Sequence, residues 1–472
     1  MMRWLAPLAM LCAAVLMPAG AATPDEQAAA ALAGRVLGRA SAGFVFEQRP
    51  ADGGRDSFEL SSRGQRVVVR GNSALSMAVA LNWYLKYHAR ASVSLNGRQV
   101  TLPSPLPPLA EPVRQTAWAA DRYFLNYCTF GYSMPWWDWP QWERFIDFMA
   151  LQGINEPLAV TGQEAVWQAV GRRFGLTDAE FDAFLAGPPY LPFQWMGCLD
   201  SHGGPLPKAW VARHADLARR ILARERSLGM KPVLQGFTGH VPPALMAKFP
   251  DAKAQRIHWL GFSTLMLDPT DPLFAKIGAA FIEEQTRLFG TDHRYAADSF
   301  IEMTPPTGDL DYLANTGRAI YQAMAQSDPQ AVWLLQGWTF MNQAAFWKPE
   351  RIRAFLDAVP DDHMLVLDLF CESNPVWKAT EAFFGKPWVW SFVYLFGDTT
   401  TLGSSGPLQR FADLADARRD PRGANLRGVG LMMEGFGHNP LLYDLMFESA
   451  WRDQIDLPAW LPDFAAYRYG RR

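Results

Sequence analysis

The 472-residue chain has little net charge of either sign. Its formal charge is −3, and only 19% of its residues are charged. A balance so close to neutral gives no basic footprint for nucleic acid and no polybasic patch for a membrane surface. With 49% hydrophobic residues, the chain is nevertheless too apolar to be disordered, and its length is enough for two or three domains.

Cysteine is also scarce, with four residues in the whole chain. Cys12 lies in an N-terminal apolar stretch, which leaves Cys128, Cys198 and Cys371. Three cysteines at such wide spacing do not make a disulfide framework, although they leave room for one bridge.

Long apolar runs are missing except at the N-terminus. Arg3 precedes the apolar run 5–17, and the small residues 19–21 follow it. This pattern is typical of a secretory signal at residues 1–21, cleaved after Ala21. No later run reaches the length of a membrane span. We therefore expect a soluble protein that is secreted or periplasmic.

Several catalytic motifs are absent as well. The sequence has no Gly-rich phosphate loop and no His-Glu-x-x-His or close His-x-His pair. It also has no Gly-x-Ser-x-Gly elbow. Metal-dependent and serine hydrolases are therefore disfavoured, and we expect no metal and no organic cofactor.

Aromatic residues, by contrast, are abundant. They make up 13% of the chain and include 19 Trp. Indole faces can stack on sugar rings, and large aromatic side chains also build cores. Composition alone leaves both interpretations open.

The first hundred residues predict a small α/β domain over residues 22–102. Helical patterns cover residues 25–39 and 73–89, and short strands lie between them. Asn96-Gly97 between two further short strands indicates a hairpin with a type I′ turn. Five closely spaced prolines then mark residues 103–113 as a linker.

Beyond the linker, apolar strand patterns alternate with helical ones as far as residue 452. This alternation predicts a (β/α)8 TIM barrel over residues 114–452, with an open doubly wound sheet as the alternative. The strand count is uncertain by one, and residues 453–472 form a short tail. The eight expected strands are Ala117–Asn126, Asn155–Val160, Pro232–Phe237, Tyr295–Glu302, Val332–Gly337, Met364–Phe370, Trp388–Leu395 and Gly428–Glu434.

Two glutamates end two of these strands. Glu302 precedes Pro305 and Pro306, and Glu434 precedes Gly435. The carboxyl ends of barrel strands carry the chemistry of this fold. A pair of carboxyls there is what a glycosidase needs, at about 5–5.5 Å for retention or about 6.5–9.5 Å for inversion. A sequence does not give this distance, and either residue could instead be a rim carboxylate in a salt bridge.

Trp338 and His240 also follow strand ends. The indole of Trp338 can reach the barrel mouth as an apolar platform for a sugar. His240 either contacts ligand or is a structural residue.

The ordered motifs of residues 126–451 resemble family 89 glycoside hydrolases, the α-N-acetylglucosaminidases. The matching stretches are Asn126-Tyr-Cys-Thr129, Trp136-Trp-Asp-Trp-Pro-Gln-Trp-Glu-Arg144, Gly162-Gln-Glu-Ala165, Gly204-Pro-Leu-Pro207, Gly239-His-Val-Pro242, Phe289-Gly-Thr-Asp-His293, Glu302-Met-Thr-Pro-Pro306, Ala331-Val-Trp-Leu-Leu-Gln-Gly-Trp338, Leu365-Val-Leu-Asp-Leu-Phe370 and Glu434-Gly435.

This resemblance implies a retaining exo-glycosidase that releases terminal α-linked N-acetylglucosamine from glycans. It places Glu302 at the acid/base position and Glu434 at the nucleophile position. It assigns the substrate-binding positions to Asn126, Cys128, Gln163, Glu164, His240 and Trp338.

The chain also departs from the family pattern. Ile301 stands where Asn is usual, Cys198 and His202 where Asn and an aromatic residue are usual, and the stretch 394–398 is altered. Relative to the family, we also expect the helical C-terminal domain to be absent. The alternative function is therefore a catalytically impaired glycan-binding relative, or a half-enzyme with a separate C-terminal partner. The sequence does not settle whether the chain is a homo-oligomer.

Overall fold

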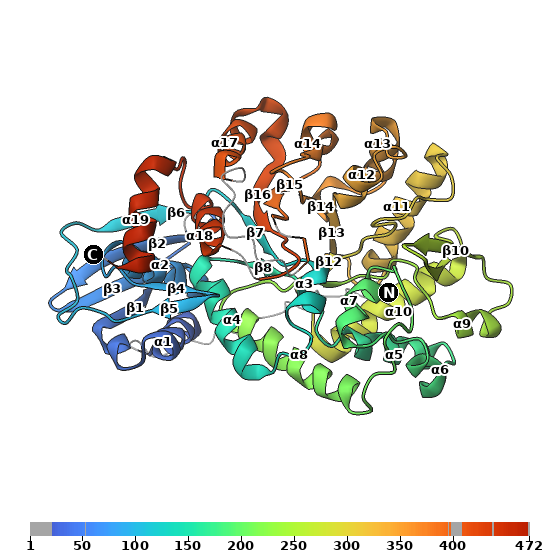
Figure 1. The fold of residues 1–472 in the computed structure, drawn as a ribbon, viewed down its shortest axis with the longest axis horizontal. Coiled ribbons are helices and arrows are strands. Elements are labelled where there is room, and N and C mark those ends of the chain that lie inside the picture. Colours follow the sequence, from blue (N-terminus) through green and yellow to red (C-terminus); the bar gives the residue numbers. More distant parts are fainter. Residues whose placement is uncertain (1–20, 52, 395, 398–407, 437–438, 471–472) are drawn as a thin grey trace, which may run out of the picture.

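The computed structural model describes residues 21–51, 53–394, 396–397, 408–436 and 439–470. Residues 1–20, which hold nearly all of the expected signal, lie outside the described residues. Figure 1 shows a smaller lobe that contains the early strands and, beside it, a larger lobe that contains the barrel.

The smaller lobe is a four-stranded sheet in the order β1-β3-β2-β6, covered by helices. Its strands are β1 (Phe44–Gln48), β2 (Ser57–Arg63), β3 (Arg66–Gly71) and β6 (Val113–Thr116). Helix α1 (Pro24–Leu37) begins with a capping box in which Thr23 and Glu26 satisfy each other's backbone N–H groups. Helix α2 (Ala74–Tyr87) is buried along almost its whole length between this sheet and the barrel. Val113–Thr116, expected at the junction of linker and barrel, thus belongs to the first sheet.

The hairpin after α2 is present, but its turn differs from the expected one. Strands β4 (Ser92–Ser94) and β5 (Gly97–Gln99) pair so that Ser94 faces Gly97. The two loop residues are therefore Leu95 and Asn96, and Gly97 lies in the second strand. The prediction of a type I′ turn centred on Asn96-Gly97 was wrong by one residue, because the strand register, and not the Asn-Gly pair, sets the loop.

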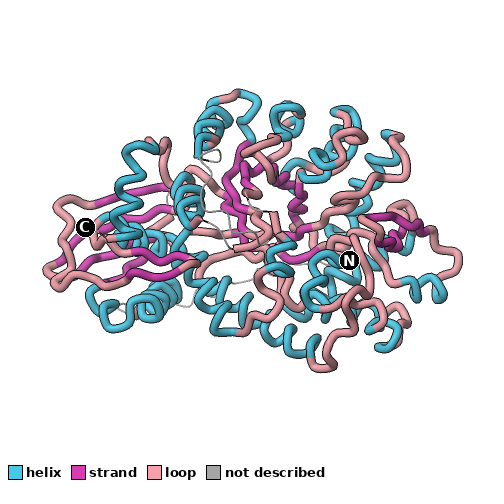
Figure 2. Tube along the Cα trace, viewed as in Figure 1, coloured by secondary structure: helices cyan, strands magenta, loops and turns pink. Residues whose placement is uncertain are grey.

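The larger lobe is an eight-stranded parallel barrel, as the sequence predicts. The sheet order is β8-β7-β16-β15-β14-β13-β12-β9. A further parallel bridge between Leu158 and Val233 joins its two ends, so the sheet closes and the open alternative is wrong. Figure 2 shows the strands as a ring inside the helices. The strands are β7 (Asp121–Phe124), β8 (Glu156–Pro157), β9 (Leu234–Gln235), β12 (Arg294–Ala296), β13 (Val332–Gln336), β14 (Met364–Asp368), β15 (Trp388–Phe392) and β16 (Leu426–Leu431).

Helices follow the strands around the outside of the barrel. Most begin with a side-chain cap or a proline in the first turn. A cap accepts a backbone N–H that the start of a helix leaves unpaired, and a proline has no such N–H. The described α-helices are α3 (Tyr127–Tyr132), α4 (Trp139–Gln152), α5 (Gln163–Arg173), α6 (Asp178–Asp182), α7 (Leu191–Trp195), α8 (Trp210–Ser227), α9 (Pro243–Lys248), α10 (Pro272–Phe289), α11 (Leu310–Ala325), α12 (Trp338–Asn342), α13 (Pro349–Asp357), α14 (Val376–Ala379), α15 (Glu381–Phe384), α17 (Phe411–Arg419), α18 (Pro440–Ser449) and α19 (Leu457–Tyr469). Short 3-10 helices are η1 (Gly38–Gly43), η2 (Pro188–Tyr190), η3 (Asp361–His363) and η4 (Pro421–Asn425). None of the described helices is both long and apolar enough to cross a membrane.

A second hairpin was not expected from the sequence. Strands β10 (Ala254–Trp259) and β11 (Phe262–Leu267) pair with each other between β9 and α10. Thr264 Oγ1 donates to Gly197 O at 2.8 Å, and Val241 N–H donates to Leu265 O at 3.0 Å. These bonds attach the hairpin to the loops at the carboxyl ends of the strands.

The two lobes share a buried, charged interface. Arg35 of α1 holds the buried Asp147 of α4 with two hydrogen bonds of 2.6 and 2.8 Å. Lys86 of α2 pairs with Asp444 of α18 at 3.0 Å. Helix α19 lies against α2, so the tail expected to be short returns to the N-terminal lobe. Because these charges are buried and paired, removing one partner would leave the other unpaired away from water.

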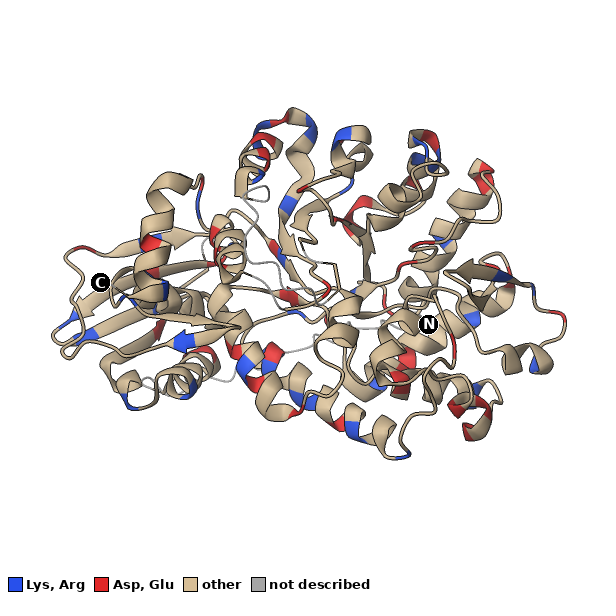
Figure 3. Cartoon of the chain, in the orientation of Figure 1, with Lys and Arg blue, Asp and Glu red and all other residues tan. Residues whose placement is uncertain are grey.

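Most tryptophans build the core. Trp333, Trp388 and Trp390 are among the largest fully buried side chains. Charged residues of both signs are interspersed over the helices of both lobes (Figure 3). The core interpretation of the aromatic content is thus confirmed for these residues, and a smaller set of indoles lines the cavity described next.

Candidate active site

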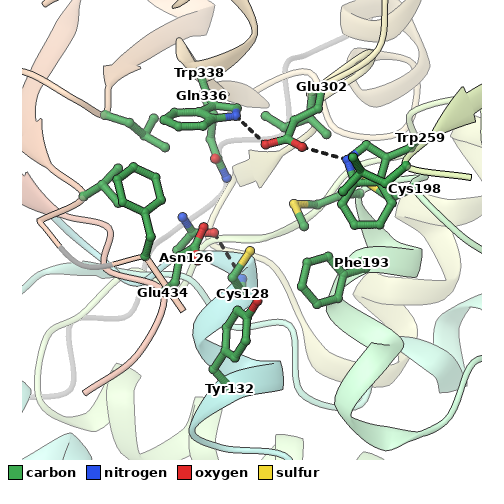
Figure 4. Close-up of a pocket in the computed structure, with 16 residues that line it drawn as sticks. Asn126, Cys128, Tyr132, Phe193, Cys198, Trp259, Glu302, Gln336, Trp338 and Glu434 are labelled. Carbon is green, nitrogen blue, oxygen red and sulfur yellow. Dashed lines mark hydrogen bonds between the residues drawn. The ribbon is translucent and has the colours of Figure 1, made fainter. Parts of the chain in front are cut away.

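A cavity of about 220 Å³ opens at the carboxyl ends of the barrel strands. Its lining comes from the carboxyl ends of all eight barrel strands, as in other barrel sites. Of the expected site residues, Asn126, Cys128, Glu302, Trp338 and Glu434 line it. Figure 4 shows these side chains converging on one space, with Glu302 and Glu434 on opposite sides.

Glu302 is held by two indoles. Trp338 Nε1–H donates to Oε1 at 2.8 Å, and Trp259 Nε1–H donates to Oε2 at 2.7 Å. Each oxygen thus accepts one bond from a rigid side chain, which fixes the plane of the carboxyl. The strand expected to end at Glu302 ends at Ala296 instead, and Glu302 follows in a turn. Phe300 in that turn has φ 61°, a strained conformation for a bulky residue of the kind found at functional sites.

Glu434 follows β16 and faces the cavity from the other side. It accepts the Gly397 N–H at 2.5 Å. Burial raises the pKa of Glu434, the negative charge of Glu302 raises it further, and the Gly397 N–H opposes the shift. The two carboxyls therefore interact electrostatically.

Asn126 and Cys128 form one wall. Asn126 caps α3, because its Oδ1 accepts the Cys128 N–H at 3.1 Å, and its Nδ2 donates to Met432 O at 3.1 Å. These bonds attach the start of α3 to the segment that leads to Glu434. Burial raises the pKa of the Cys128 thiol well above its usual value, as do the nearby carboxyls. The thiol is therefore a neutral, polarisable part of the wall.

His240, although expected to bind substrate, is fully buried outside the cavity lining. Its Nε2 pairs with Asp200 Oδ1 at 2.6 Å, and its Nδ1 lies 3.1 Å from Gln194 O. These contacts tie the segment after β9 to the loop that carries Cys198 into the cavity. The structure therefore supports the other alternative from the sequence, a structural role.

Gln163 and Glu164 also lie away from the cavity, at the start of α5. Gln163 Nε2 donates to Gln285 Oε1 at 2.9 Å in the protein interior. Glu164 is 1% exposed, and neither of its oxygens has a hydrogen-bond partner among the described residues. Burial raises the pKa of Glu164 to about 7. Neither residue lines the cavity, and Glu164 lines a separate pocket with Trp195 and Trp210.

The further cavity residues that were missed as site residues include Trp259, Gln336, Tyr132 and Phe193. Trp259 lies on the unexpected hairpin, where its ring is flanked by Phe193 and Phe262 at centroid distances of 5.7 and 6.1 Å. The signal for Trp259 was present, since residues 254–259 and 262–267 flank Leu260-Gly261. A signal for Gln336 was also present, because Gln336 is the last residue of the strand that Gly337-Trp338 follows.

Cys198 and Ile301, two of the departures from the family pattern, line the cavity too. Cys371 is buried, and all three described cysteines are free. Among the described residues, no group of three or more His, Cys, Asp or Glu is arranged to hold a metal ion.

Comparison with known proteins identifies the family. The family model of the α-N-acetylglucosaminidase (NAGLU) TIM-barrel domain matches residues 122–453, and that of the corresponding N-terminal domain matches residues 27–108. The chain belongs to the α-N-acetylglucosaminidase family. The human α-N-acetylglucosaminidase is 42% identical over 473 aligned residues, which cover 97% of this chain and 63% of the human protein.

Solved structures agree with this assignment. A family 89 glycoside hydrolase from Clostridium perfringens, in complex with 2-acetamido-1,2-dideoxynojirimycin, is 32% identical with a TM-score of 0.88. The match covers 95% of this chain and 51% of that chain. A variant of the same enzyme, with two glutamates changed to glutamine, was solved with its substrate GlcNAc-α-1,4-galactose and matches equally well. The chain thus spans less than two thirds of the human family member and about half of the bacterial one.

More distant structures share the fold alone. The N-acetyl-β-hexosaminidase of Streptomyces plicatus is 12% identical, with a TM-score of 0.60 over 95% of this chain and 89% of that chain.

Proposed function

We propose that the chain is a retaining exo-glycosidase that hydrolyses terminal, non-reducing α-linked N-acetylglucosamine from glycans. The observation that carries the proposal is the pair Glu302 and Glu434 in one cavity, one carboxyl fixed by two indoles and the other by a backbone N–H. The family membership and the substrate of the Clostridium perfringens enzyme support the choice of sugar.

In the proposed mechanism, Glu302 donates a proton to the glycosidic oxygen as that bond breaks, and Glu434 Oε attacks the anomeric carbon. The product of this step is a β-linked glycosyl-enzyme and a free aglycone alcohol. A water molecule then gives its proton to Glu302 and attacks the anomeric carbon, which releases α-N-acetylglucosamine and regenerates the Glu434 carboxylate. The residues invoked need no metal and no organic cofactor.

The two carboxyls affect each other's ionisation. Two interacting carboxyls take up protons as a coupled pair, and the charge on one disfavours ionisation of the other. When Glu302 holds the proton, it no longer raises the pKa of Glu434, which can then ionise and act as the nucleophile.

The test is hydrolysis of 4-nitrophenyl α-N-acetylglucosaminide by the wild type, Glu302→Ala and Glu434→Ala, with and without azide. Rescue of Glu302→Ala with an α-azide product and of Glu434→Ala with a β-azide product is expected. The opposite assignment of products would exchange the two roles. Product anomers are read by NMR.

The alternative is a glycan-binding relative that has lost catalysis, or a half-enzyme that needs a separate C-terminal partner. Ile301 and Cys198 favour it, because apolar or thiol groups line the cavity where the family pattern has amides. Tight binding of 2-acetamido-1,2-dideoxynojirimycin by a folded wild type without turnover would support this alternative.

Export through residues 1–21 is part of the proposal, and mass spectrometry of the secreted or periplasmic protein would locate the cleavage site.

A further inference from the structure

Gln336 places its side-chain amide inside the cavity. It is the last residue of β13, and only 3% of its surface is exposed. In the part of the chain that the structure describes, Nε2 has no hydrogen-bond partner. Figure 4 shows the amide pointing into the space between Glu302 and Glu434. A buried primary amide can donate two hydrogen bonds, and native proteins rarely leave such a donor unsatisfied.

Two other polar side chains of the cavity are already engaged. The two oxygens of Glu302 accept from Trp259 and Trp338. The side chain of Asn126 is occupied by Cys128 N–H and Met432 O. Gln336 is therefore well suited to contact a ligand without breaking an existing bond.

The amide is also fixed in place by its backbone. Gln336 N–H donates to Asp298 Oδ1 at 2.7 Å, and the next residue, Gly337, donates to Leu367 O at 2.7 Å. Both acceptors come from neighbouring barrel strands or the segments that follow them. A group held on a strand end in this way can discriminate between ligands, since little ordering is needed on binding.

Several apolar or thiol side chains surround the same space. Cys128, Met196, Cys198 and Ile301 line the cavity, and all are buried. An acetamido group needs both a polar and an apolar surface, because it has a carbonyl acceptor, an N–H donor and a methyl group. A primary amide is complementary to the two polar atoms, and a thiol and aliphatic wall is complementary to the methyl.

We propose that Gln336 is the specificity-determining residue that recognises the 2-acetamido group of the terminal sugar. Its amide donates to the acetamido carbonyl, while the sulfur and isoleucine side chains receive the methyl. This inference rests on the proposed function, since it assumes that the terminal sugar occupies the cavity.

The test compares Gln336→Leu, which keeps the approximate size but removes the amide, with wild type on two substrates. These are 4-nitrophenyl α-N-acetylglucosaminide and 4-nitrophenyl α-glucoside, which has a hydroxyl in place of the acetamido group. For Gln336→Leu, kcat/KM on the first substrate should fall about 10- to 100-fold, and on the glucoside it should change by less than about threefold. Gln322→Leu, at an exposed position on α11, is the matched control and should match wild type.

The same comparison is made by calorimetry with 2-acetamido-1,2-dideoxynojirimycin and 1-deoxynojirimycin, so that the result does not depend on turnover. If Gln336→Leu lowers kcat/KM or affinity equally for the compound with the acetamido group and the one without it, Gln336 contacts another part of the sugar. If neither value falls, Gln336 does not contact the sugar. Either result overturns the inference but leaves the proposed function intact. A folded wild type that neither binds nor hydrolyses any of these compounds would overturn both.

Discussion

Trp259 Nε1 lies 2.7 Å from Glu302 Oε2, although the two residues come from separate parts of the barrel face. Trp259 belongs to a hairpin outside the barrel, and Glu302 to the turn after β12. The hairpin therefore takes part in positioning the proposed acid/base, together with Trp338.

Trp259→Phe should lower kcat more than it raises KM, because phenylalanine keeps the ring but cannot donate to Glu302. Loss of a hydrogen bond to an ionisable group costs roughly 1.5–3 kcal/mol, or about 10- to 100-fold in rate. Steady-state kinetics on 4-nitrophenyl α-N-acetylglucosaminide check this. Trp136→Phe is the control, since Trp136 is 65% exposed and lies outside the cavity lining. A pure rise in KM would instead make Trp259 a sugar platform.

Glu302→Gln should move the acid limb of the pH profile to lower pH. Glu434 must be ionised to attack, so activity appears as the pH rises through its pKa. That pKa is raised by burial and then by the charge of Glu302, and the substitution removes the second cause. The measurement is kcat/KM against pH with a substrate whose phenolic leaving group needs no proton. An acid limb that stays in place or moves up would contradict the proposed coupling.

Glu164→Gln should remove a pH dependence of stability. Burial raises the pKa of Glu164 to about 7 in the folded chain, from an ordinary value of 4.5. The folded state therefore binds more protons than the unfolded state between these values, and stability falls as the pH rises through this window. The full effect is about 3 kcal/mol.

Urea unfolding at pH 5 and pH 8 measures this difference. Wild type should lose stability between the two values, and Glu164→Gln should lose less. The exposed Glu350→Gln, in the first turn of α13, should behave as wild type. If wild type and Glu164→Gln lose the same stability between pH 5 and pH 8, Glu164 is not the source of the pH dependence.

His240→Ala should mainly reduce stability. The side chain is fully buried and contacts Asp200 and Gln194, so its removal leaves a cavity and an unpaired carboxylate contact. Comparable losses are about 2–4 kcal/mol in the free energy of unfolding. Chemical denaturation checks this, with the exposed His258→Ala as the control. Unchanged stability with a large rise in KM would restore the expectation that His240 binds substrate.

Much of the fold follows from local sequence pattern. The barrel strands are short apolar runs that become buried on both faces, as in β14. The strand containing Tyr295 was placed correctly but made too long. Residues 297–301 are buried as in a strand, yet they lead through the turn that presents Glu302.

The site residues, too, could be predicted from the sequence only in part. A carboxyl near the end of a buried strand is visible in the sequence, so Glu302 and Glu434 could be identified, and the resemblance added Asn126 and Cys128. Gln163, Glu164 and His240 were in matching motifs of the same quality but do not line the cavity. A matching motif shows that a residue type fits the family pattern, but it does not show whether the side chain faces ligand or protein.

The sequence by itself determined the alternation of strands and helices, the carboxyls at two strand ends and the family, because periodicity and motifs are local properties of the chain. Only the tertiary structure decided that Trp259 reaches Glu302, that Gln336 Nε2 has no hydrogen-bond partner among the described residues and that His240 pairs with Asp200. Those relationships depend on barrel closure and on the packing of the β10–β11 hairpin, which join residues far apart in the chain.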